Sequence, residues 1–277
     1  MRPTLLFLLM ITLLTACISP TPTPAGPPTA TPSADWKLIW ADEFDLPDDS
    51  PVDPAKWSFA VGAGGWGNGE FQYYTDNRLE NAHIENGMLV ITARKEDFMG
   101  QDYTSARLLT NRKGDWLYGR FEIRAKLPSG QGIWPAIWMM PTDVTYGGWP
   151  KSGEIDIMEL IGKEPSRVYG TLHFGAPHDS KGGFYDLTAG QVFADDFHVF
   201  ALEWEPTEIR WYVDGYHYQT QTRWFTSSTK GKYPAPFDQR FYLIMNVAVG
   251  GAWPGPPNET TVFPQSMLVD YVRVFQK

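Results

Sequence analysis

Three acidic residues stand in one short apolar stretch, "GEIDIMEL", at residues 153–160. They are Glu154, Asp156 and Glu159, and the residues between them are Ile and Met. Successive side chains of a β-strand point to opposite faces, so Glu154 and Asp156 share a face whereas Glu159 should point to the other. Acids are rarely buried without partners, so these three must face water, a ligand or one another.

A β-bulge would bring the third acid into phase. It inserts one extra residue, after which the side-chain alternation resets. A bulge at Ile157-Met158 would return Glu159 to the face of Glu154 and Asp156. The Cα atoms of the two glutamates would then be roughly 13 Å apart. Leaning side chains can close the carboxyl groups to the approximately 5–5.5 Å that suits a double-displacement glycosidase.

Such a trio can divide the work of breaking a glycosidic bond. One glutamate attacks the anomeric carbon as a carboxylate, the other donates a proton to the leaving oxygen, and an aspartate between them holds the nucleophile. Two plainer alternatives are a solvated sheet face and a salt-bridged structural cluster. Either would normally place basic residues in the same strand, and this strand has none. Together with the tryptophans nearby in the sequence, the pattern favours catalysis.

The elements that position the acids are predicted to be β-strands. Residues 118–127 alternate between a small or apolar face and a mostly charged face, and Asp214-Gly215 predicts a hairpin turn. We expect an all-β fold, an antiparallel two-sheet β-sandwich of the jelly-roll kind, with the polar loops 61–70 and 175–196 at the border of a concave cleft. Similar alternation or apolar runs occur at 88–93, 105–110, 133–140, 154–161, 167–174, 197–204, 208–213, 216–220, 240–248 and 267–275.

The composition excludes several classes of partner. The 277 residues, of which 43% are hydrophobic and 15% aromatic, are enough for one large core. The formal charge is −9 and no cluster of Lys or Arg occurs, so we expect no nucleic-acid binding. The single cysteine excludes an intrachain disulfide, and the five histidines lack the spacing of a zinc motif. A neutral partner fits these properties best.

The N-terminus has the pattern of a targeting segment. Residues 1–16 combine one arginine with a short apolar run and then small residues, as in a signal peptide. "LTAC" resembles the lipobox of bacterial lipoproteins, which predicts an acylated Cys17; an ordinary secretory peptide is the alternative. Residues 17–35 form a tether rich in Pro and Thr, and 36–277 form the catalytic domain. We therefore expect secretion across the cytoplasmic membrane, with a lipid anchor at the cell surface as the only membrane contact.

The strand with the three acids also carries a family resemblance. "GEIDIMELIG" resembles the active-site signature of glycoside hydrolase family 16, in the laminarinase-like branch with the spacing E-x-D-x-x-E. The resemblance implies a concanavalin A-like jelly roll in which Glu154 is the nucleophile, Asp156 the assisting carboxylate and Glu159 the acid/base. Further blocks that are similar, in the order of the family, are "WADEFD" (40–45), "GNGEFQYYT" (67–75), "IENGMLVITARKE" (84–96), "GRFEIRAKLPSGQGIWPAIWMMP" (119–141), "MNVAVGGAWPG" (245–255) and "VDYVRVF" (269–275).

The resemblance further implies residues that bind the substrate. Trp134 and Trp138 share a strand face and would stack on sugar rings beside the cleaved bond. Arg107 would donate hydrogen bonds to sugar hydroxyls, with a surface salt bridge as the alternative. His173 would lie near the acid/base on the leaving-group side, with a structural histidine as the alternative. Further candidates for the rim are Glu70, Tyr74, Asn246 and Trp253.

No cofactor is expected for catalysis, but the resemblance implies a possible structural Ca²⁺ on the convex face. Its ligands would be the carboxylates of Glu43 and Asp270 and the backbone carbonyl of Gly87. Oxygen ligands of this kind suit calcium. Ordinary surface salt bridges at Glu43 and Asp270 are the alternative.

These expectations combine into a monomeric, retaining endo-glycosidase that hydrolyses internal β-1,3 bonds of laminarin-type β-glucans. Alternatives within the family are a mixed-linkage β-1,3-1,4-glucanase, a galactanase and a transglycosylase. The extra residue before Glu159 favours the laminarinase-like branch. A non-catalytic glucan-binding sandwich is the alternative from another class, but a binder does not need three acids in one strand.

Overall fold

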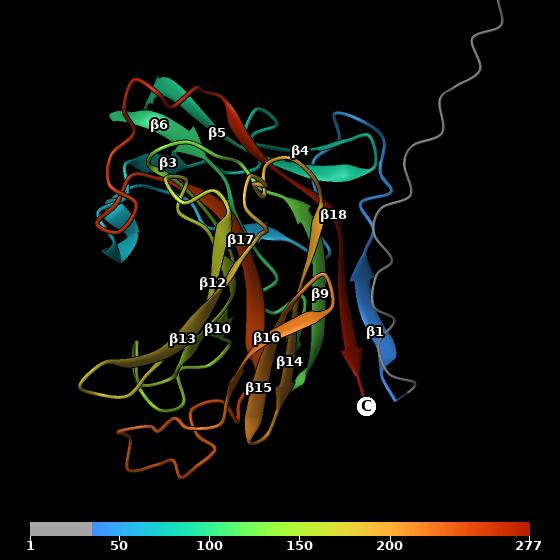
Figure 1. The fold of residues 1–277 in the computed structure, drawn as a ribbon, viewed down its shortest axis with the longest axis vertical. Coiled ribbons are helices and arrows are strands. Elements are labelled where there is room, and N and C mark those ends of the chain that lie inside the picture. Colours follow the sequence, from blue (N-terminus) through green and yellow to red (C-terminus); the bar gives the residue numbers. More distant parts are fainter. Residues whose placement is uncertain (1–34) are drawn as a thin grey trace, which may run out of the picture.

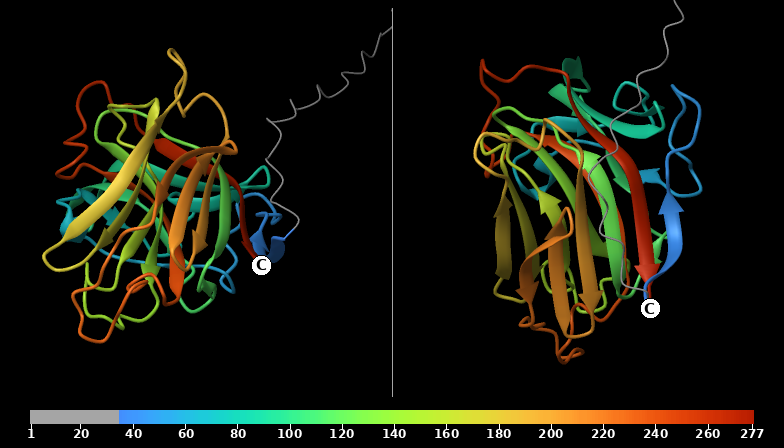
Figure 2. Two further views of the ribbon diagram at one scale, coloured as in Figure 1. Left: turned by 60° about the horizontal axis from the view of Figure 1, so that its bottom comes forward. Right: turned by 45° about the vertical axis from the view of Figure 1, so that its right-hand side comes forward.

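The computed structural model describes residues 35–277, so the predicted signal peptide, Cys17 and nearly all of the tether lie outside the described residues. In this part of the chain, two large and mostly antiparallel sheets face each other (Figure 1, Figure 2). The expected all-β sandwich is confirmed. No helix within residues 35–277 has the length and apolar character to cross a membrane.

One sheet has ten strands and forms the outer, convex layer. Its order is β16 (Tyr216–Gln221), β15 (Glu208–Val213), β14 (His198–Glu205), β9 (Gly119–Lys126), β18 (Gln265–Gln276), β5 (Met88–Phe98), β6 (Gln101–Ser105) and β3 (Gln72–Tyr74), with β1 (Lys37–Asp42) beside β18 and β4 (Ala82–Glu85) beside β5. The Asp214-Gly215 turn joins β15 to β16, with positive φ at both residues, as its sequence predicts.

The second sheet has eight strands and carries the three acids. Its order is β13 (Asp179–Asp186), β12 (Arg167–Phe174), β11 (Glu154–Glu159), β10 (Ile133–Pro141), β17 (Phe241–Val249), β7 (Arg107–Leu109) and β2 (Ser58–Phe59), with β8 (Asp115–Trp116) beside β17. The expected loop at 175–196 is partly wrong, because it contains β13, the strand at one edge of this sheet. A short 3₁₀ turn at Gly65–Gly67 lies in the other expected loop.

The core lies between the two sheets and is built from the period-two pattern. Phe121, Ile123 and Ala125 of β9 are fully buried, as the alternation of that segment predicts. Polar contacts also cross this core; in one of them, the indole N–H of Trp211 on β15 donates to the backbone carbonyl oxygen of Asp156 at 2.8 Å. Buried polar groups need such partners, so Trp211 anchors the strand of acids from behind.

The β-bulge that the spacing of the acids predicts is present in β11. Against β10, Ile137 pairs with Met158 but the next residue, Trp138, pairs with Asp156, so that Ile157 is the extra residue. Ile157 and Met158 are both buried in the core. The bulge thus hides two consecutive apolar side chains and reverses the phase of the strand.

The register with β12 shows where the bulge places the three acids. Glu154 lies opposite His173, Asp156 opposite Thr171, and Glu159 opposite Tyr169. The shift falls between Asp156 and Glu159, where three steps along β11 match two steps along β12. All three acids therefore occupy one face of the sheet, away from the core.

Deleting Met158 should abolish this arrangement. Without the extra residue, the alternation turns Glu159 toward the core, and hydrolysis of laminarin, the activity that the resemblance implies, should fall by at least roughly 10²-fold. Reducing-end assays measure this loss, and circular dichroism checks that the sheets form. Met158→Leu keeps the residue count and should stay within a few-fold of the parent. A folded deletion variant with near-normal activity would contradict the role of the bulge.

Candidate active site

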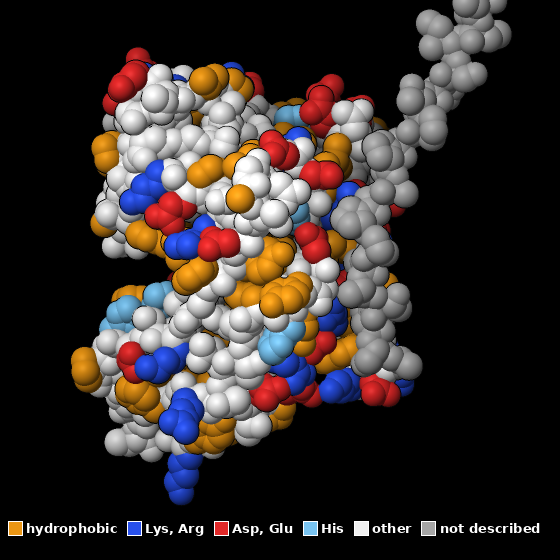
Figure 3. All heavy atoms as spheres, viewed as in Figure 1, with side chains coloured by type: hydrophobic (Ala, Val, Ile, Leu, Met, Phe, Trp, Pro, Cys, Tyr) orange, Lys and Arg blue, Asp and Glu red, His pale blue; other side chains and the backbone are white. Residues whose placement is uncertain are grey.

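A cleft of about 650 Å³ lies over the acidic face of the eight-stranded sheet. In Figure 3 the same side of the molecule has a deep notch with histidine side chains on its lower lip. The cleft brings together residues from most strands of this sheet and from the loops before and after them. Its lining includes Trp66, Asn68, Glu70, Arg107, Trp134, Trp138, Trp149, Glu154, Asp156, Glu159, Thr171, His173, His178, Asn246 and Trp253.

Each glutamate of the trio accepts a hydrogen bond from a tryptophan. The indole N–H of Trp149 donates to Glu154 Oε2 at 2.5 Å, and that of Trp134 donates to Glu159 Oε1 at 3.1 Å. Hydrogen bonds from such donors favour the charged form of a carboxyl group and fix its orientation. Each glutamate is therefore held by its own tryptophan, Glu154 by Trp149 and Glu159 by Trp134.

His173 contacts the aspartate of the trio. Its Nε2 lies 3.2 Å from Asp156 Oδ2, and Glu154, Asp156 and His173 form one compact group whose polar atoms lie within 4.8 Å of one another. The prediction that His173 lies near Glu159 holds only in part: the register of β12 places it opposite Glu154, although its charge also acts on Glu159. On its other side, Nδ1 of His173 is 2.9 Å from Nε2 of His178, so the ring is oriented from both edges.

The carboxyl groups of the trio hold protons more strongly than free acids do. Burial, and then the charge of Asp156, raises the pKa of Glu154 to about 8, although one side of Glu154 is open to the cleft. Burial raises the pKa of Asp156 to about 7. Burial and the charges of both neighbours raise the pKa of Glu159 well above its usual value. Like charges in a poorly solvated site cannot all ionise together, so the trio retains at least one proton near neutral pH.

The floor on the other side of the trio is aromatic and cationic. The guanidinium of Arg107 lies between two indole rings, 4.8 Å from the centroid of Trp66 and 4.6 Å from that of Trp138. The Trp138 N–H donates to Asn246 Oδ1 at 2.8 Å. Arg107 thus lines the cleft in a stacked geometry rather than at an exposed surface, and its remaining N–H groups are placed to meet a polar ligand.

Three of the rim candidates form a chain of hydrogen bonds at this floor. Asn246 donates to the Tyr74 hydroxyl at 3.0 Å, and Tyr74 donates to Glu70 Oε2 at 3.1 Å. Tyr74 is fully buried and does not line the cleft, so its prediction as a substrate-binding residue is wrong; Glu70 and Asn246 do line it. Burial and the charge of Glu70 raise the pKa of Tyr74 well above its usual value, which keeps the hydroxyl a donor.

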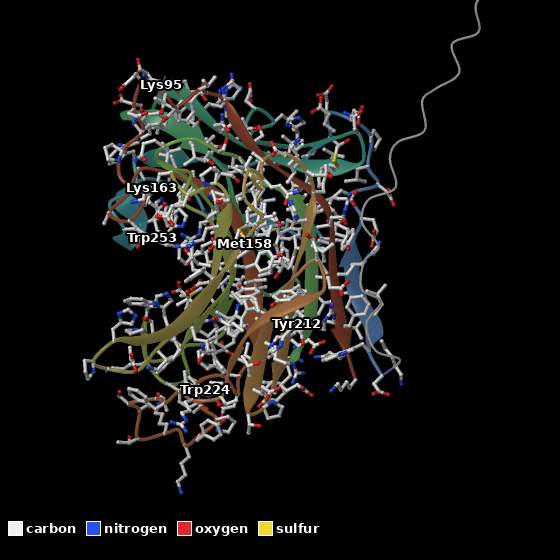
Figure 4. All side chains as sticks on the ribbon, in the orientation of Figure 1. Lys95, Met158, Lys163, Tyr212, Trp224 and Trp253 are labelled. Carbon is white, nitrogen blue, oxygen red and sulfur yellow. The ribbon has the colours of Figure 1, made fainter. Side chains whose placement is uncertain are left out.

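Trp253 lies at the mouth of the cleft on a loop after β17. Its ring meets that of Trp134 edge to face at 5.5 Å and that of Tyr169 at 5.0 Å, and it remains partly exposed. Figure 4 shows it on the notched side of the molecule. The structure therefore brings Trp134, Trp138, Arg107, His173 and Trp253 to one cleft, as the sequence predicts.

Three aromatic or histidine residues of the cleft were not predicted from the sequence. Trp66 sits on the 3₁₀ turn with a left-handed backbone, Trp149 on the loop before β11, and His178 on the turn after β12. Trp149 and His178 also contact each other, with ring centroids 4.9 Å apart. The signal that could have found them is position, since each is an aromatic or histidine residue in a loop or turn next to a strand.

The predicted calcium ligands lie away from the cleft. Glu43 accepts two hydrogen bonds from Arg273, both at 2.8 Å, and Asp270 accepts one from Arg124 at 2.7 Å. Gly87 lies in the turn between β4 and β5. Because guanidinium groups already neutralise both carboxylates, these residues do not fit a calcium ion in this arrangement, which favours the salt-bridge alternative. The calcium itself stays a prediction.

Comparisons with known proteins agree with the geometry. Residues 69–273 match the family model of Glycosyl hydrolases family 16. The chain is 49% identical over 249 residues to a protein named beta-glucanase from Rhodothermus marinus, covering 87% of this chain and 85% of the relative. It is 43% identical over 258 residues to a glucan endo-1,3-beta-glucosidase from Cryptopygus antarcticus, covering 86% and 91%. The crystal structure of the laminarinase catalytic domain from Thermotoga maritima is similar with a TM-score of 0.78 at 48% identity, covering 88% of this chain and 99% of that one.

The raised carboxyl pKa values predict a cost in stability. A carboxyl group whose pKa rises on folding binds more protons in the folded state. Its contribution to the stability of the folded state is therefore present at low pH and is lost as pH rises through the folded pKa. For Glu154 this window extends from its ordinary value to about 8. Glu154→Gln removes the titration, so at pH 8 its free energy of unfolding should exceed that of the parent by about 1–3 kcal/mol.

Urea unfolding at pH 5 and at pH 8 checks this prediction. The quantity to compare is the change in the free energy of unfolding between pH 5 and pH 8. The amide of Glu154→Gln can also alter the hydrogen bond with Trp149, but this effect is equal at the two pH values. Parallel pH dependences in the variant and the parent would refute a raised pKa at Glu154.

Proposed function

The chain belongs to glycosyl hydrolases family 16, and on that basis we propose that it is a retaining endo-glycosidase that hydrolyses internal β-1,3-glucosidic bonds of laminarin-type β-glucans. The observation that carries the proposal is the bulged strand β11, which puts Glu154, Asp156 and Glu159 on one face within the cleft. The names of the two relatives and of the similar crystal structure support the substrate class.

We assign the first chemical step to the two glutamates. The Glu154 carboxylate attacks the anomeric carbon and forms a glycosyl ester as the bond to the leaving oxygen breaks. Glu159 gives its proton to that oxygen, and the shortened glucan leaves. The high proton affinity of Glu159 supports this role, because an acid must still hold its proton at the working pH.

In the second step the same groups act in reverse. Glu159, now a carboxylate, takes a proton from water as the water oxygen bonds to the anomeric carbon, and the ester bond to Glu154 breaks. Asp156 and its contact with His173 hold Glu154 between the steps. The Trp149 hydrogen bond and the charge of His173 both favour the ionised form of Glu154 that the attack requires.

The surroundings of the trio support a long neutral substrate. Trp134, Trp138 and Trp253 offer ring faces and edges for the C–H surfaces of sugars, and Arg107 offers hydrogen-bond donors. In Figure 3 the notch on this side of the molecule is open to the outside. Such a shape suits attack at internal bonds of a polymer.

Our proposal for the cellular location of the enzyme is based on its N-terminal sequence. We propose that residues 1–16 direct export, that Cys17 is acylated, and that the Pro/Thr-rich segment 17–35 holds the catalytic domain off the membrane as a monomer at the cell surface. A lipid anchor would place the cleft beside polysaccharide outside the cell.

Glu154→Gln tests the proposed chemistry. It removes the nucleophile while preserving shape, so release of reducing ends from laminarin should fall by at least about 10³-fold with glucan binding retained. A matched control is Glu85→Gln, an exposed residue of β4 in the other sheet, which should leave activity unchanged. Parent protein that binds laminarin but hydrolyses no β-glucan would instead establish the non-catalytic binder.

A further inference from the structure

Two rows of side chains continue across the sheet beyond β11. In the first row, Glu159 pairs with Tyr169 on β12, and Tyr169 pairs with Phe184 on β13. Residues that pair directly in an antiparallel ladder point to the same face. Phe184 therefore lies on the face that carries the acids, two strands away from Glu159.

The second row runs from the other glutamate. Glu154 pairs with His173, and His173 pairs with Ser180 on β13. Both rows therefore end on β13, the first in the aromatic ring of Phe184 and the second in the small hydroxyl side chain of Ser180.

Between these rows the face is nearly bare. Asp156 pairs with Thr171, and Thr171 pairs with Gly182, which is exposed. A Cβ atom at residue 182 would lie 2.9 Å from Thr171 Oγ1, so glycine leaves the floor at the level of the backbone. We call the strip over Thr171 and Gly182, between the aromatic row and the polar row, the trough.

The aromatic wall is continuous from the acids to the edge of the sheet. Trp134, which donates to Glu159, contacts Trp253, and Trp253 contacts Tyr169. The ring of Phe184 follows at 6.3 Å from that of Tyr169. Phe184 is 52% exposed, so the wall ends in an aromatic ring that is open to solvent.

An ion pair holds this last ring in place. The guanidinium of Arg167 lies 4.0 Å from the centroid of Phe184, and Arg167 donates two hydrogen bonds to Asp186 at 2.7 and 2.8 Å. A single exposed apolar residue needs no special explanation. A ring that is oriented by a bidentate ion pair, in line with a catalytic residue, is a preorganised contact surface.

We propose that this trough over β12 and β13 is a further glucosyl-binding position, with Phe184 as its outer wall. The inference rests on the proposed function and extends it. The cleft described above reaches Thr171 and His173 but not β13. Phe184 is two strand spacings of roughly 4.8 Å from Glu159, so the position lies beyond the sugar that borders the cleaved bond. Since β13 is an edge strand, as Figure 1 shows, the polymer leaves the enzyme there without obstruction.

Phe184→Ala tests the proposal. The KM for long laminarin should rise roughly 3- to 10-fold, the loss expected for one aromatic contact, while kcat changes less than about 2-fold. On laminariheptaose labelled at its reducing end, the main cleavage position should shift by one unit, and on laminaritriose the variant should match the parent. Tyr216→Ala is the matched control, because Tyr216 is also an exposed aromatic residue but contacts Tyr185 on the opposite face of β13.

A binding measurement separates this proposal from the proposed function. In the Glu154→Gln background, calorimetry with laminariheptaose should show the same loss of affinity for Phe184→Ala, and Phe184→Tyr should restore it. Unchanged affinity and an unchanged cleavage pattern would overturn the binding position even if the parent is an active glucanase. A loss confined to kcat would also overturn it, because a distant wall contributes binding and not chemistry.

Discussion

Crowding of like charges in one strand is the constraint around which this structure is organised. Three carboxyl groups side by side repel one another and lose hydration, which raises their proton affinity. The arrangement persists because both glutamates and the backbone of β11 have hydrogen-bond partners. Trp149 and Trp134 donate to the two glutamates, and Trp211 donates to the backbone from the core side. The ten-stranded sheet thus supports β11 through a buried hydrogen bond as well as through packing.

The bulge and the strands were accessible from sequence because they are local. Alternation with period two marks β9 and β12, and an acid at an odd step among apolar residues has few physical explanations. Here the extra residue, Ile157, is apolar and is followed by Met158, so both can be buried where the phase changes. For the same reason, the site residues that lie on strands could be predicted from the sequence.

What the sequence did not reveal depends on contacts between distant segments. Trp149 and His178 lie on separate loops, and only the fold brings their rings together. Tyr74 resembles a cleft residue by type, but its hydroxyl is used beneath the floor. The partners of Glu43 and Asp270 are arginines of β18 and β9, which no local pattern specifies. Strand β13 was missed because it is polar and glycine-rich, and at the edge of a sheet it needs no apolar alternation.

The composition of the edge strand β13 also affects the tendency of the protein to associate with other copies of itself. An edge exposes unpaired backbone N–H and C=O groups and invites a second molecule to extend the sheet. Between Asp179 and Asp186, β13 carries Lys181 and the weak strand formers Gly182 and Gly183, a composition that disfavours pairing with another copy. The features that leave room for a glucan chain at this edge are thus the ones that would protect the molecule from aggregation.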